Sequence, residues 1–162
     1  MKNTIKYLIL LIIYLVCGVN LQAQNYTFRN VVMSDGLSGL LVNAIYKDSE
    51  GFVWLGTDNC LDRFDGVKVR HYEFRGVDSG RKKRVNCITE TADNQLWVGN
   101  GIGLWRLNRA NGQLERIVPE KIDFAVNTLL PDGDILYIGT EKGLFIQEDG
   151  QLLQVLTDRS EE

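Results

Sequence analysis

The chain is poor in the residues that build several classes of protein. Its 162 residues include 3 Cys, 2 Pro and 1 His. So few cysteines exclude a disulfide framework, and two prolines exclude a collagen-like or proline-rich disordered chain. A formal net charge of -3 gives no sign of a nucleic-acid binder. Hydrophobic residues make up 44% of the chain, which is enough for one ordinary globular domain.

The first 23 residues have the pattern of an export signal. Lys2 and Lys6 precede an uncharged apolar run, residues 7–17, and a short polar stretch leads to Ala23. The run is too short to span a bilayer, for which about 20 residues are needed. We therefore predict a signal peptide over residues 1–23, a periplasmic mature chain and no membrane segment in it. An uncleaved membrane anchor is the alternative.

The cysteines leave one question open. Cys17 lies in the predicted signal, and the large Val16 before it argues against a lipid-modified cysteine. Cys60 and Cys87 remain after cleavage. They are either a single disulfide or two small unpaired hydrophobic residues.

Three segments of the mature chain repeat one motif. Each begins with Val-Asn, at residues 42–43, 85–86 and 126–127. An aromatic residue follows ten or eleven positions after the Asn, a glycine comes two positions later, and a leucine comes seven positions after the aromatic residue. These repeat positions are Trp54, Gly56, Leu61, Trp97, Gly99, Leu104, Tyr137, Gly139 and Leu144. A period of about 42 residues indicates a repeat architecture.

Each repeat is predicted to form four short strands. In the first repeat they span residues 42–47, 52–57, 61–64 and 67–74. The dipeptides Asp65-Gly66, Asn111-Gly112 and Asp149-Gly150 favour two-residue type I′ hairpin turns. No apolar helical periodicity extends over ten residues outside the signal. The fold is therefore predicted to be all-β.

Four strands per repeat are typical of a β-propeller blade. We predict an amino-terminal lead-in over residues 24–41 and blades over residues 42–84, 85–124 and 125–156, followed by a tail over residues 157–162. Because stacked blades bury each other's faces, the three repeat aromatic residues are predicted to lie between blades. The alternative is an aromatic platform that stacks on a sugar ring.

The motif resembles the two-component regulator propeller repeat. The resemblance rests on residues 35–38, 42–45, 48–57, 61–66 and 71–72, and Trp-x-Gly-Thr followed by x-x-Gly-Leu is its most specific part. Tyr26-Thr27-Phe28-Arg29 resembles the opening of the sensor region in hybrid two-component systems of Bacteroidetes-type bacteria. This sequence departs from the repeat at Cys60, Asn100 and Tyr137.

The resemblance implies a periplasmic sensor of polysaccharide fragments. In that family a kinase, a receiver and a DNA-binding domain follow the propeller, and none of their elements is present in this sequence. We therefore predict a non-enzymatic sensory fragment of about three blades, with an oligosaccharide as ligand. The alternatives are a fragment of a propeller-type polysaccharide lyase or glycosidase and a secreted interaction scaffold.

The remaining motifs predict no catalytic residue, metal or cofactor. The acidic residues are attributed to turns, where Asp accepts backbone hydrogen bonds. They are Asp48, Glu50, Asp58, Asp62, Asp65, Asp132 and Asp134. Arg81-Lys82-Lys83-Arg84 is predicted to be a solvated connector, with an anionic-sugar or partner contact as the alternative.

Three blades alone would leave apolar faces uncovered. Leu129, Ile135 and Leu144 are predicted to lack a neighbour, and the Tyr26–Phe28 segment is expected to complete a blade from the far end of a ring. The partners predicted for these faces are further propeller blades or a second copy of the chain. No nucleic-acid partner is expected.

Overall fold

The structure is a computed structural model that describes residues 5–7, 30–77, 83–117 and 122–155. It divides into two compact units, residues 1–30 and 31–162. In the first unit, residues 5–7 are helical. The rest of the predicted signal, the Tyr26–Phe28 segment and the predicted tail lie outside the described residues. Within the described parts of the chain, no helix is long and apolar enough to cross a membrane.

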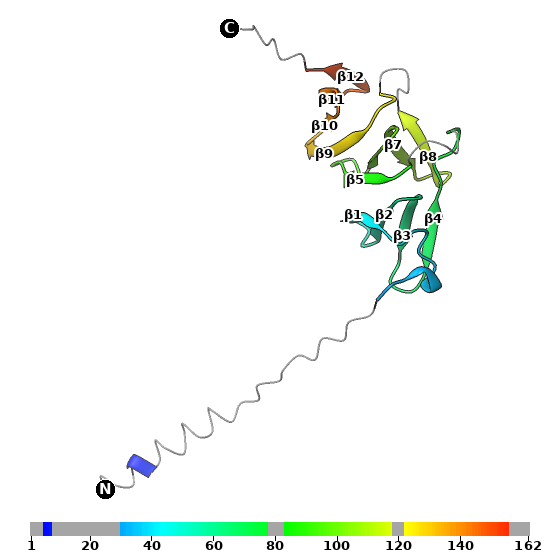
Figure 1. Ribbon diagram of the computed structural model, residues 1–162. Coiled ribbons are helices and arrows are strands. Elements are labelled where there is room, and N and C mark those ends of the chain that lie inside the picture. The colour runs from blue at the N-terminus through cyan, green and yellow to red at the C-terminus, as the bar shows by residue number, and fades with distance from the viewer. Residues whose placement is uncertain (1–4, 8–29, 78–82, 118–121, 156–162) are drawn as a thin grey trace. The chain divides into compact units, whose positions relative to one another are not determined.

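The second unit consists of three antiparallel sheets of four strands each, and each sheet keeps its strands in chain order (Figure 1). The strands of the first sheet are β1 (Val42–Lys47), β2 (Val53–Thr57), β3 (Leu61–Phe64) and β4 (Val69–Tyr72). Those of the second are β5 (Val85–Glu90), β6 (Leu96–Asn100), β7 (Gly103–Asn108) and β8 (Gln113–Ile117). Those of the third are β9 (Val126–Asp132), β10 (Ile135–Thr140), β11 (Gly143–Glu148) and β12 (Gln151–Gln154). The predicted all-β fold of three propeller-like blades is confirmed.

The repeated Val-Asn pair marks a β-bulge at the start of every sheet. Val42 pairs with Thr57 and Ala44 with Gly56, so the register skips Asn43. The same shift skips Asn86 in β5 and Asn127 in β9. A bulge adds one unpaired residue and increases the local twist. In the second sheet the skipped residue gains a new partner, because Asn86 Nδ2 donates to the carbonyl oxygen of Val126 at 2.9 Å.

The hairpin turns differ from the sequence prediction in two repeats out of three. In the third, Asp149 and Gly150 have φ values of 49° and 73°, which a type I′ turn requires at both central positions. In the first, only Gly66 has positive φ, and Asp65 Oδ1 accepts the backbone N–H groups of Val67 and Lys68. The second likewise has positive φ only at Gly112. Four-residue loops capped by Asp or Asn side chains replace the predicted two-residue turns there, because such side chains satisfy the turn directly.

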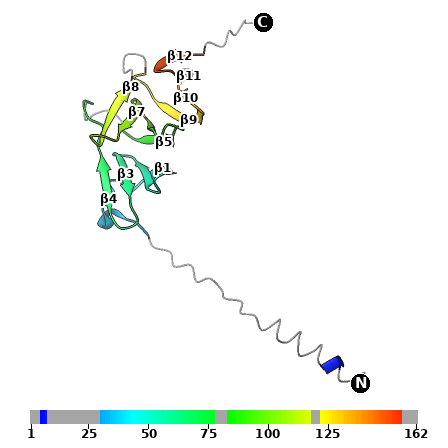
Figure 2. The same ribbon diagram turned by 180° about the vertical axis from the view of Figure 1, so that it is seen from behind.

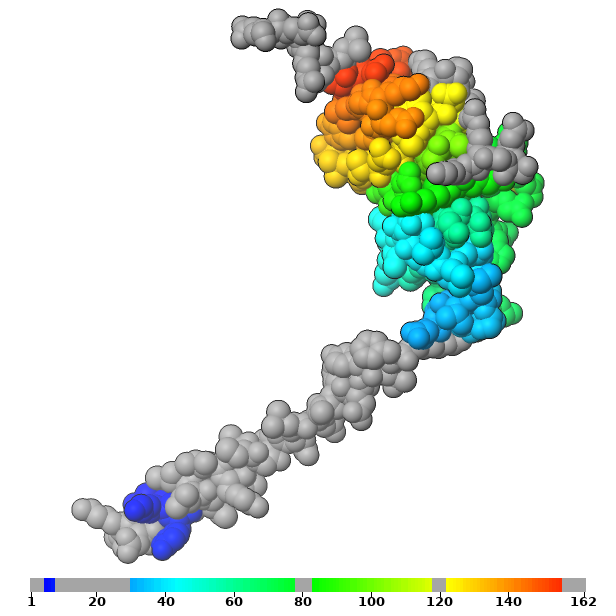
Figure 3. All heavy atoms as spheres, in the orientation of Figure 1, coloured from blue at the N-terminus to red at the C-terminus, as the bar shows by residue number. Residues whose placement is uncertain are grey.

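Consecutive sheets bury a hydrophobic core between them. Figure 2 shows the three sheets from behind, and the space-filling view in Figure 3 shows them following one another in chain order. We call the packing of the first sheet on the second the first junction, and that of the second on the third the second junction. At the first junction Trp54, Leu61 and Tyr72 pack with Val85 and other residues of the second sheet. At the second, Trp97 and Leu104 pack with a cluster that includes Ile138 and Phe145.

The two outer faces of this stack carry exposed apolar side chains. On the first sheet Ile45 is 69% exposed, and on the third sheet Leu130 is 62% exposed. Leu144 is exposed, as predicted, but Leu129 and Ile135 are half-buried. The prediction was wrong for Leu129, whereas Ile135 is packed against neither described core cluster and lies on the same face of β10 as Tyr137. Leu129 contacts the second hydrophobic core, so its own neighbours cover part of its side chain.

Candidate functional site

The first junction is built around Trp54 of β2. This side chain is fully buried, and its indole N–H donates to Asp48 Oδ2 at 2.7 Å. Asp48 is buried in the turn between β1 and β2, where its other oxygen accepts the backbone N–H of Phe52 at 2.8 Å. The turn therefore fixes the orientation of the indole ring. A buried carboxylate of this kind is costly unless hydrogen bonds and a cation accompany it.

Arg109, in the loop between β7 and β8, supplies that cation. Its Nη2 lies 2.9 Å from Glu90 Oε1 and 3.8 Å from Asp48 Oδ2, and its Nη1 lies 3.0 Å from Glu50 Oε2. Its Nε donates to the carbonyl oxygen of Asn94 at 3.0 Å. One guanidinium group thus joins the turn of the first sheet to the first strand of the second.

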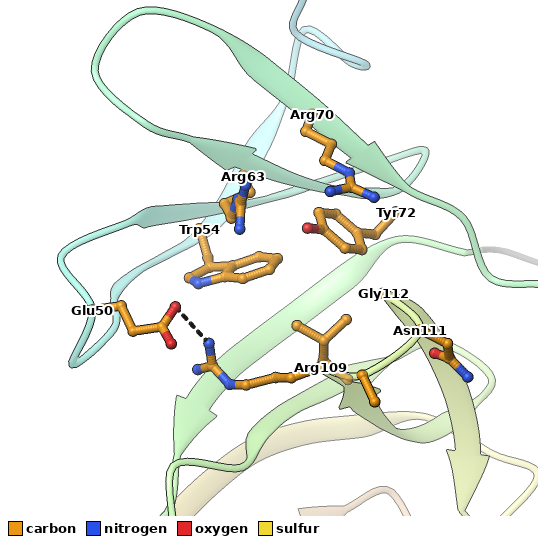
Figure 4. A pocket seen from close by; sticks show the side chains of 10 residues that line it. Glu50, Trp54, Arg63, Arg70, Tyr72, Arg109, Asn111 and Gly112 are labelled. Carbon is orange, nitrogen blue, oxygen red and sulfur yellow. Dashed lines mark ion pairs between the residues drawn. The ribbon is translucent and has the colours of Figure 1, made fainter.

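A pocket of about 320 Å³ opens beside this network, between the first two sheets (Figure 4). Trp54 and Tyr72, with ring centroids 5.1 Å apart, form part of its wall. Three arginines also line the pocket, Arg63 on β3, Arg70 on β4 and Arg109. We call it the basic pocket. Its complete lining is Glu50, Trp54, Arg63, Arg70, Tyr72, Leu107, Arg109, Ala110, Asn111 and Gly112.

Sequence reasoning did not single out these arginines. Arg63 follows Trp54 by nine residues, and Arg106 follows Trp97 by the same interval. This recurrence is the one signal that could have identified Arg63 as a repeat position. Arg70 and Arg109 carry no such signal, because the folded sheets alone bring them to the same pocket.

A pocket of about 310 Å³ lies at the equivalent place of the second junction, but its charge is opposite. Asp93, Asp134 and Asp149 line it, together with Arg106. Arg106 already has a carboxylate partner, because its Nη2 lies 3.6 Å from Glu115 Oε2. We call this the acidic pocket. Its complete lining is Thr91, Asp93, Gln95, Trp97, Arg106, Asp134, Gln147, Asp149 and Gly150.

The predicted repeat positions differ in burial from one sheet to the next. Trp54, Leu61 and Leu104 are fully enclosed, and Trp97 is nearly so. Tyr137 is half-buried, and Leu144 of the same sheet is 39% exposed. The described residues place no further sheet against the third one, so its outward-facing repeat positions remain open.

The repeat glycines lie where sheets approach most closely. A side chain on Gly56 would put its Cβ 2.8 Å from the Cβ of Val85, in the next sheet. At Gly99 it would lie 3.0 Å from the Cβ of Val126, again in the next sheet. Gly139 instead faces Thr128 of its own sheet. The first two glycines therefore set the spacing of the junctions.

A second polar cluster surrounds Asp62, which is fully buried in β3. Ser38 donates to Asp62 Oδ2 from its backbone N at 2.8 Å and from its Oγ at 2.7 Å. His71 Nδ1 lies 2.7 Å from Asp62 Oδ1, and Cys60 Sγ donates to the same oxygen at 3.3 Å. This corrects the prediction that Asp62 serves a turn, because its side chain anchors the lead-in segment to the first sheet.

The same cluster has a donor set that metals use. The ligand atoms of Cys60, Asp62 and His71 lie within 4.8 Å of one another. Ser38 and His71 both contact Asp62, so the carboxylate lies between them. A nucleophilic serine is instead activated by a base that the acid orients, so this order does not match a catalytic triad. In this structure the cluster links the lead-in segment to β3 and β4.

Both described cysteines are free, so the structure contains no bond between Cys60 and Cys87. Burial raises the pKa of each thiol to about 12. Thiols react as thiolates, so both are expected to be inert at neutral pH.

The other predicted features fall partly outside the described residues. Asp65 serves a turn as predicted, and the backbone N–H groups of Lys68 and Val67 lower its pKa. Of the basic connector, Arg81 and Lys82 lie outside the described residues, and Lys83 borders a pocket next to His71 and Ser38.

A model of the two-component regulator propeller matches residues 36–59, the segment that runs from the lead-in through β2 into the following turn. Residues 36–59 carry the two-component regulator propeller repeat. Histidine kinase P4 of Formosa agariphila is 32% identical to this propeller chain over 79 residues. Those residues are 49% of this chain and 6% of the kinase.

Solved propeller structures resemble the chain as well. Two structures of the extracellular domain of BT4673 from B. thetaiotaomicron, assigned as a hybrid two-component system in one and a one-component system in the other, superpose with TM-scores of 0.58 and 0.59. Each is 30% identical and covers 70% of this chain and 16% of the other. Virginiamycin B lyase from Staphylococcus aureus has a TM-score of 0.51 at 18% identity over 71% of this chain and 41% of the lyase, which shows the fold alone. The chain thus spans 6% of the kinase and 16% of the extracellular domains that it matches.

Proposed function

We propose that this chain is a non-enzymatic sensory segment of a periplasmic propeller that recognises polysaccharide-derived ligands for a hybrid two-component system. The observation that supports it most is the 30% identity to an extracellular two-component domain over 70% of this chain. The match of residues 36–59 to the two-component regulator propeller supports it independently.

The exposed outer faces support a role within a larger propeller. Ile45 on one face and Leu130, Leu144 and Leu153 on the other are large apolar side chains between 39% and 69% exposed. Propellers close with four to eight blades, and each blade covers its neighbour's face. We infer that further blades of the same propeller cover these two faces, and that a second copy of the chain covers them when those blades are absent.

Ligand recognition is tested with a panel of defined oligosaccharides, from plant and host polysaccharides, in a thermal-shift assay on the full chain. A sensory segment is expected to gain stability with one class of oligosaccharide and not with the others, because a ligand that binds only the folded state raises its melting temperature. The same polysaccharides incubated with the chain should release no new reducing ends or unsaturated sugars. Release of such products would favour the lyase or glycosidase alternative.

Export is tested on the protein expressed with its own first 23 residues. We expect mass spectrometry to find a periplasmic protein that begins at Gln24, because Lys2, Lys6, the apolar run and Ala23 together form a cleavable signal. An intact Met1 terminus in the membrane fraction would favour the uncleaved anchor.

The solution state is tested by size-exclusion chromatography with light scattering. Exposed apolar faces favour association, so we expect oligomers or aggregates. Glutamate at Leu144 and Leu153 should shift the protein towards smaller species, and glutamate at Lys68, which is exposed in the loop between β3 and β4, provides a control of similar charge change. A monodisperse monomer with one sharp unfolding transition would contradict the assignment of these faces to a further blade.

A further inference from the structure

Two arginines of the basic pocket face each other across neighbouring strands. Arg63 of β3 is the direct register partner of Arg70 of β4. Like charges placed directly opposite in a sheet destabilise it. Among the described residues, neither guanidinium group has a carboxylate within ion-pair distance. Arg63 helps to lower the pKa of the exposed Asp65 from beyond that distance, but within the described ranges neither arginine has a direct carboxylate partner to offset the repulsion.

The surroundings hold both groups in place without neutralising them. The Arg63 Cζ lies 4.1 Å from the centroid of the Phe52 ring, and the Arg70 Cζ lies 5.2 Å from that of Tyr72. Arg63 Nε is buried and has no hydrogen-bond acceptor in the described part of the chain. A buried N–H without an acceptor costs free energy, so such groups usually have a partner.

The third arginine of the pocket does not share this deficit. Arg109 is paired with Glu50 and Glu90 and lies on the opposite wall, as Figure 4 shows. Its charge is balanced, and the uncompensated positive charge belongs to Arg63 and Arg70. These two groups lie on the same side of the pocket, above Trp54 and Tyr72 in that view.

The equivalent pocket shows that this charge is no requirement of the fold. The acidic pocket has the same place in the next repeat and almost the same volume, but three carboxylates line it. Its arginine, Arg106, has Glu115 as a partner. The paired, uncompensated arginines are therefore particular to the first junction.

We propose that the basic pocket binds the oxyanion group of an acidic sugar, a carboxylate or a sulfate ester, through the guanidinium groups of Arg63 and Arg70. Arginine binds such groups with two parallel N–H donors, which gives strong and directional hydrogen bonds. The volume is at the lower end of ligand pockets, which suits one acidic sugar unit. The inference rests on the proposed function and narrows its ligand to an acidic oligosaccharide.

The experiment is a calorimetric titration of the full chain with four probes at low salt. These are glucuronate, N-acetylglucosamine 6-sulfate, glucose as the neutral sugar and inorganic sulfate as the free anion. We expect at least one acidic sugar to bind about tenfold or more tightly than glucose, because hydrogen bonds between oppositely charged groups are stronger than those between neutral groups. Inorganic sulfate should bind more weakly than the sulfated sugar, and sulfate of equal affinity would overturn the assignment to a sugar.

Four variants identify the pocket. Arg63→Gln and Arg70→Gln should each weaken binding of the acidic sugar about tenfold or more, and Arg106→Gln, the matched change in the acidic pocket, should leave it unchanged. Arg70→Lys keeps the charge but loses the paired donors, so we expect an intermediate loss. Arg70 is exposed, so its variants should fold even where Arg63→Gln does not, and thermal unfolding of each variant checks this.

The outcomes separate this inference from the proposed function. Equal affinity for glucuronate, sulfated sugar and glucose, or an equal loss in Arg106→Gln, would overturn the inference. Failure of all the probes to bind would overturn it as well. In each case a response to a neutral oligosaccharide in the thermal-shift panel would leave the sensory function standing.

Discussion

At the first junction the indole N–H of Trp54 donates to a buried carboxylate, whereas at the second the indole N–H of Trp97 donates to the hydroxyl of Thr91 at 3.1 Å. Asp48 and Thr91 hold the same place in their repeats. The carboxylate is accompanied by Arg109, and the neutral hydroxyl needs no cation. The acceptor of the indole N–H and the cation beside it therefore differ together between the two junctions, because a buried charge is tolerated only with its counter-charge.

Polar links between neighbouring sheets also differ between the two junctions. Ser49 donates to Glu90 from its backbone N at 2.8 Å and from its Oγ at 2.9 Å. The same carboxylate is paired with Arg109. The turn before β2 is thereby connected to β5 of the next sheet. At the second junction the corresponding link is the bond from Asn86 to the Val126 carbonyl.

The largest effect is expected where the next sheet covers the aromatic residue of a repeat. Trp54→Ala should lower the free energy of unfolding by about 3–5 kcal/mol, because it removes a fully enclosed side chain and leaves a cavity. Trp97→Ala should cost a similar amount. Tyr137→Ala is the internal control, and its half-buried side chain should cost clearly less. Denaturant unfolding of the three variants measures the differences, and equal losses at all three sites would contradict the comparison.

The next effect concerns how tightly the sheets enclose their thiols. Burial raises the pKa of Cys60 and of Cys87 to about 12, from about 8.5 in an unfolded chain. Below the raised pKa the neutral thiol predominates, so at pH 8 alkylation by iodoacetamide should be slower by on the order of a thousandfold in the native protein than in guanidinium. Peptide mass spectrometry reads each site separately.

The raised pKa of the thiols also predicts how the stability of the fold depends on pH. A raised pKa means that the folded state retains a proton that the unfolded state releases, so both thiols should reduce stability as pH rises above about 8.5. In the alkylation experiment, fast labelling of Cys87 but not of Cys60 in the native protein would show that the second junction opens more readily than the first sheet.

A third prediction removes the acceptor of the indole N–H at each junction. Asp48→Ala should lower the free energy of unfolding by about 2–3 kcal/mol, because the N–H groups of Trp54 and Phe52 lose a charged acceptor. Thr91→Val should cost less, about 1 kcal/mol, because Trp97 loses a neutral acceptor and the other partner of the hydroxyl, Asp93 at 2.6 Å, is an exposed carboxylate that water can solvate. Thermal and denaturant unfolding measure both. A greater loss at Thr91 would contradict the contrast between a charged acceptor for Trp54 and a neutral acceptor for Trp97.

The last prediction tests the close approach of the sheets. Gly56→Ala should destabilise the protein by about 1–3 kcal/mol, because the new methyl group overlaps Val85 of the next sheet. The same change in a Val85→Ala background should cost less, since that variant removes the overlapping carbons. An identical penalty in both backgrounds would mean that the glycine matters for its own backbone and not for the junction.

Much of the fold could be predicted from local patterns. The periodic Val-Asn, aromatic, glycine and leucine positions predicted the repeats, and alternating short strands with turn residues predicted four strands in each. The turn type at Asp65-Gly66 was not predictable, because the side chain of Asp65 competes with the two-residue turn for the same backbone N–H groups. The bulge at each Asn was missed for a similar reason, since register depends on the partner strand.

The sequence by itself determined an all-β chain of three repeats, because strand periodicity and turn chemistry act between residues close together in the chain. Tertiary structure alone decided which polar and charged side chains contact one another. Glu90 lies 41 residues after Ser49, and Asp62 lies 24 residues after Ser38, yet both pairs are hydrogen-bonded. Arg63 and Arg70 become neighbours only when β3 pairs with β4 in one register. The basic and acidic pockets therefore follow from the stacking of the sheets, which sets distances that no local pattern encodes.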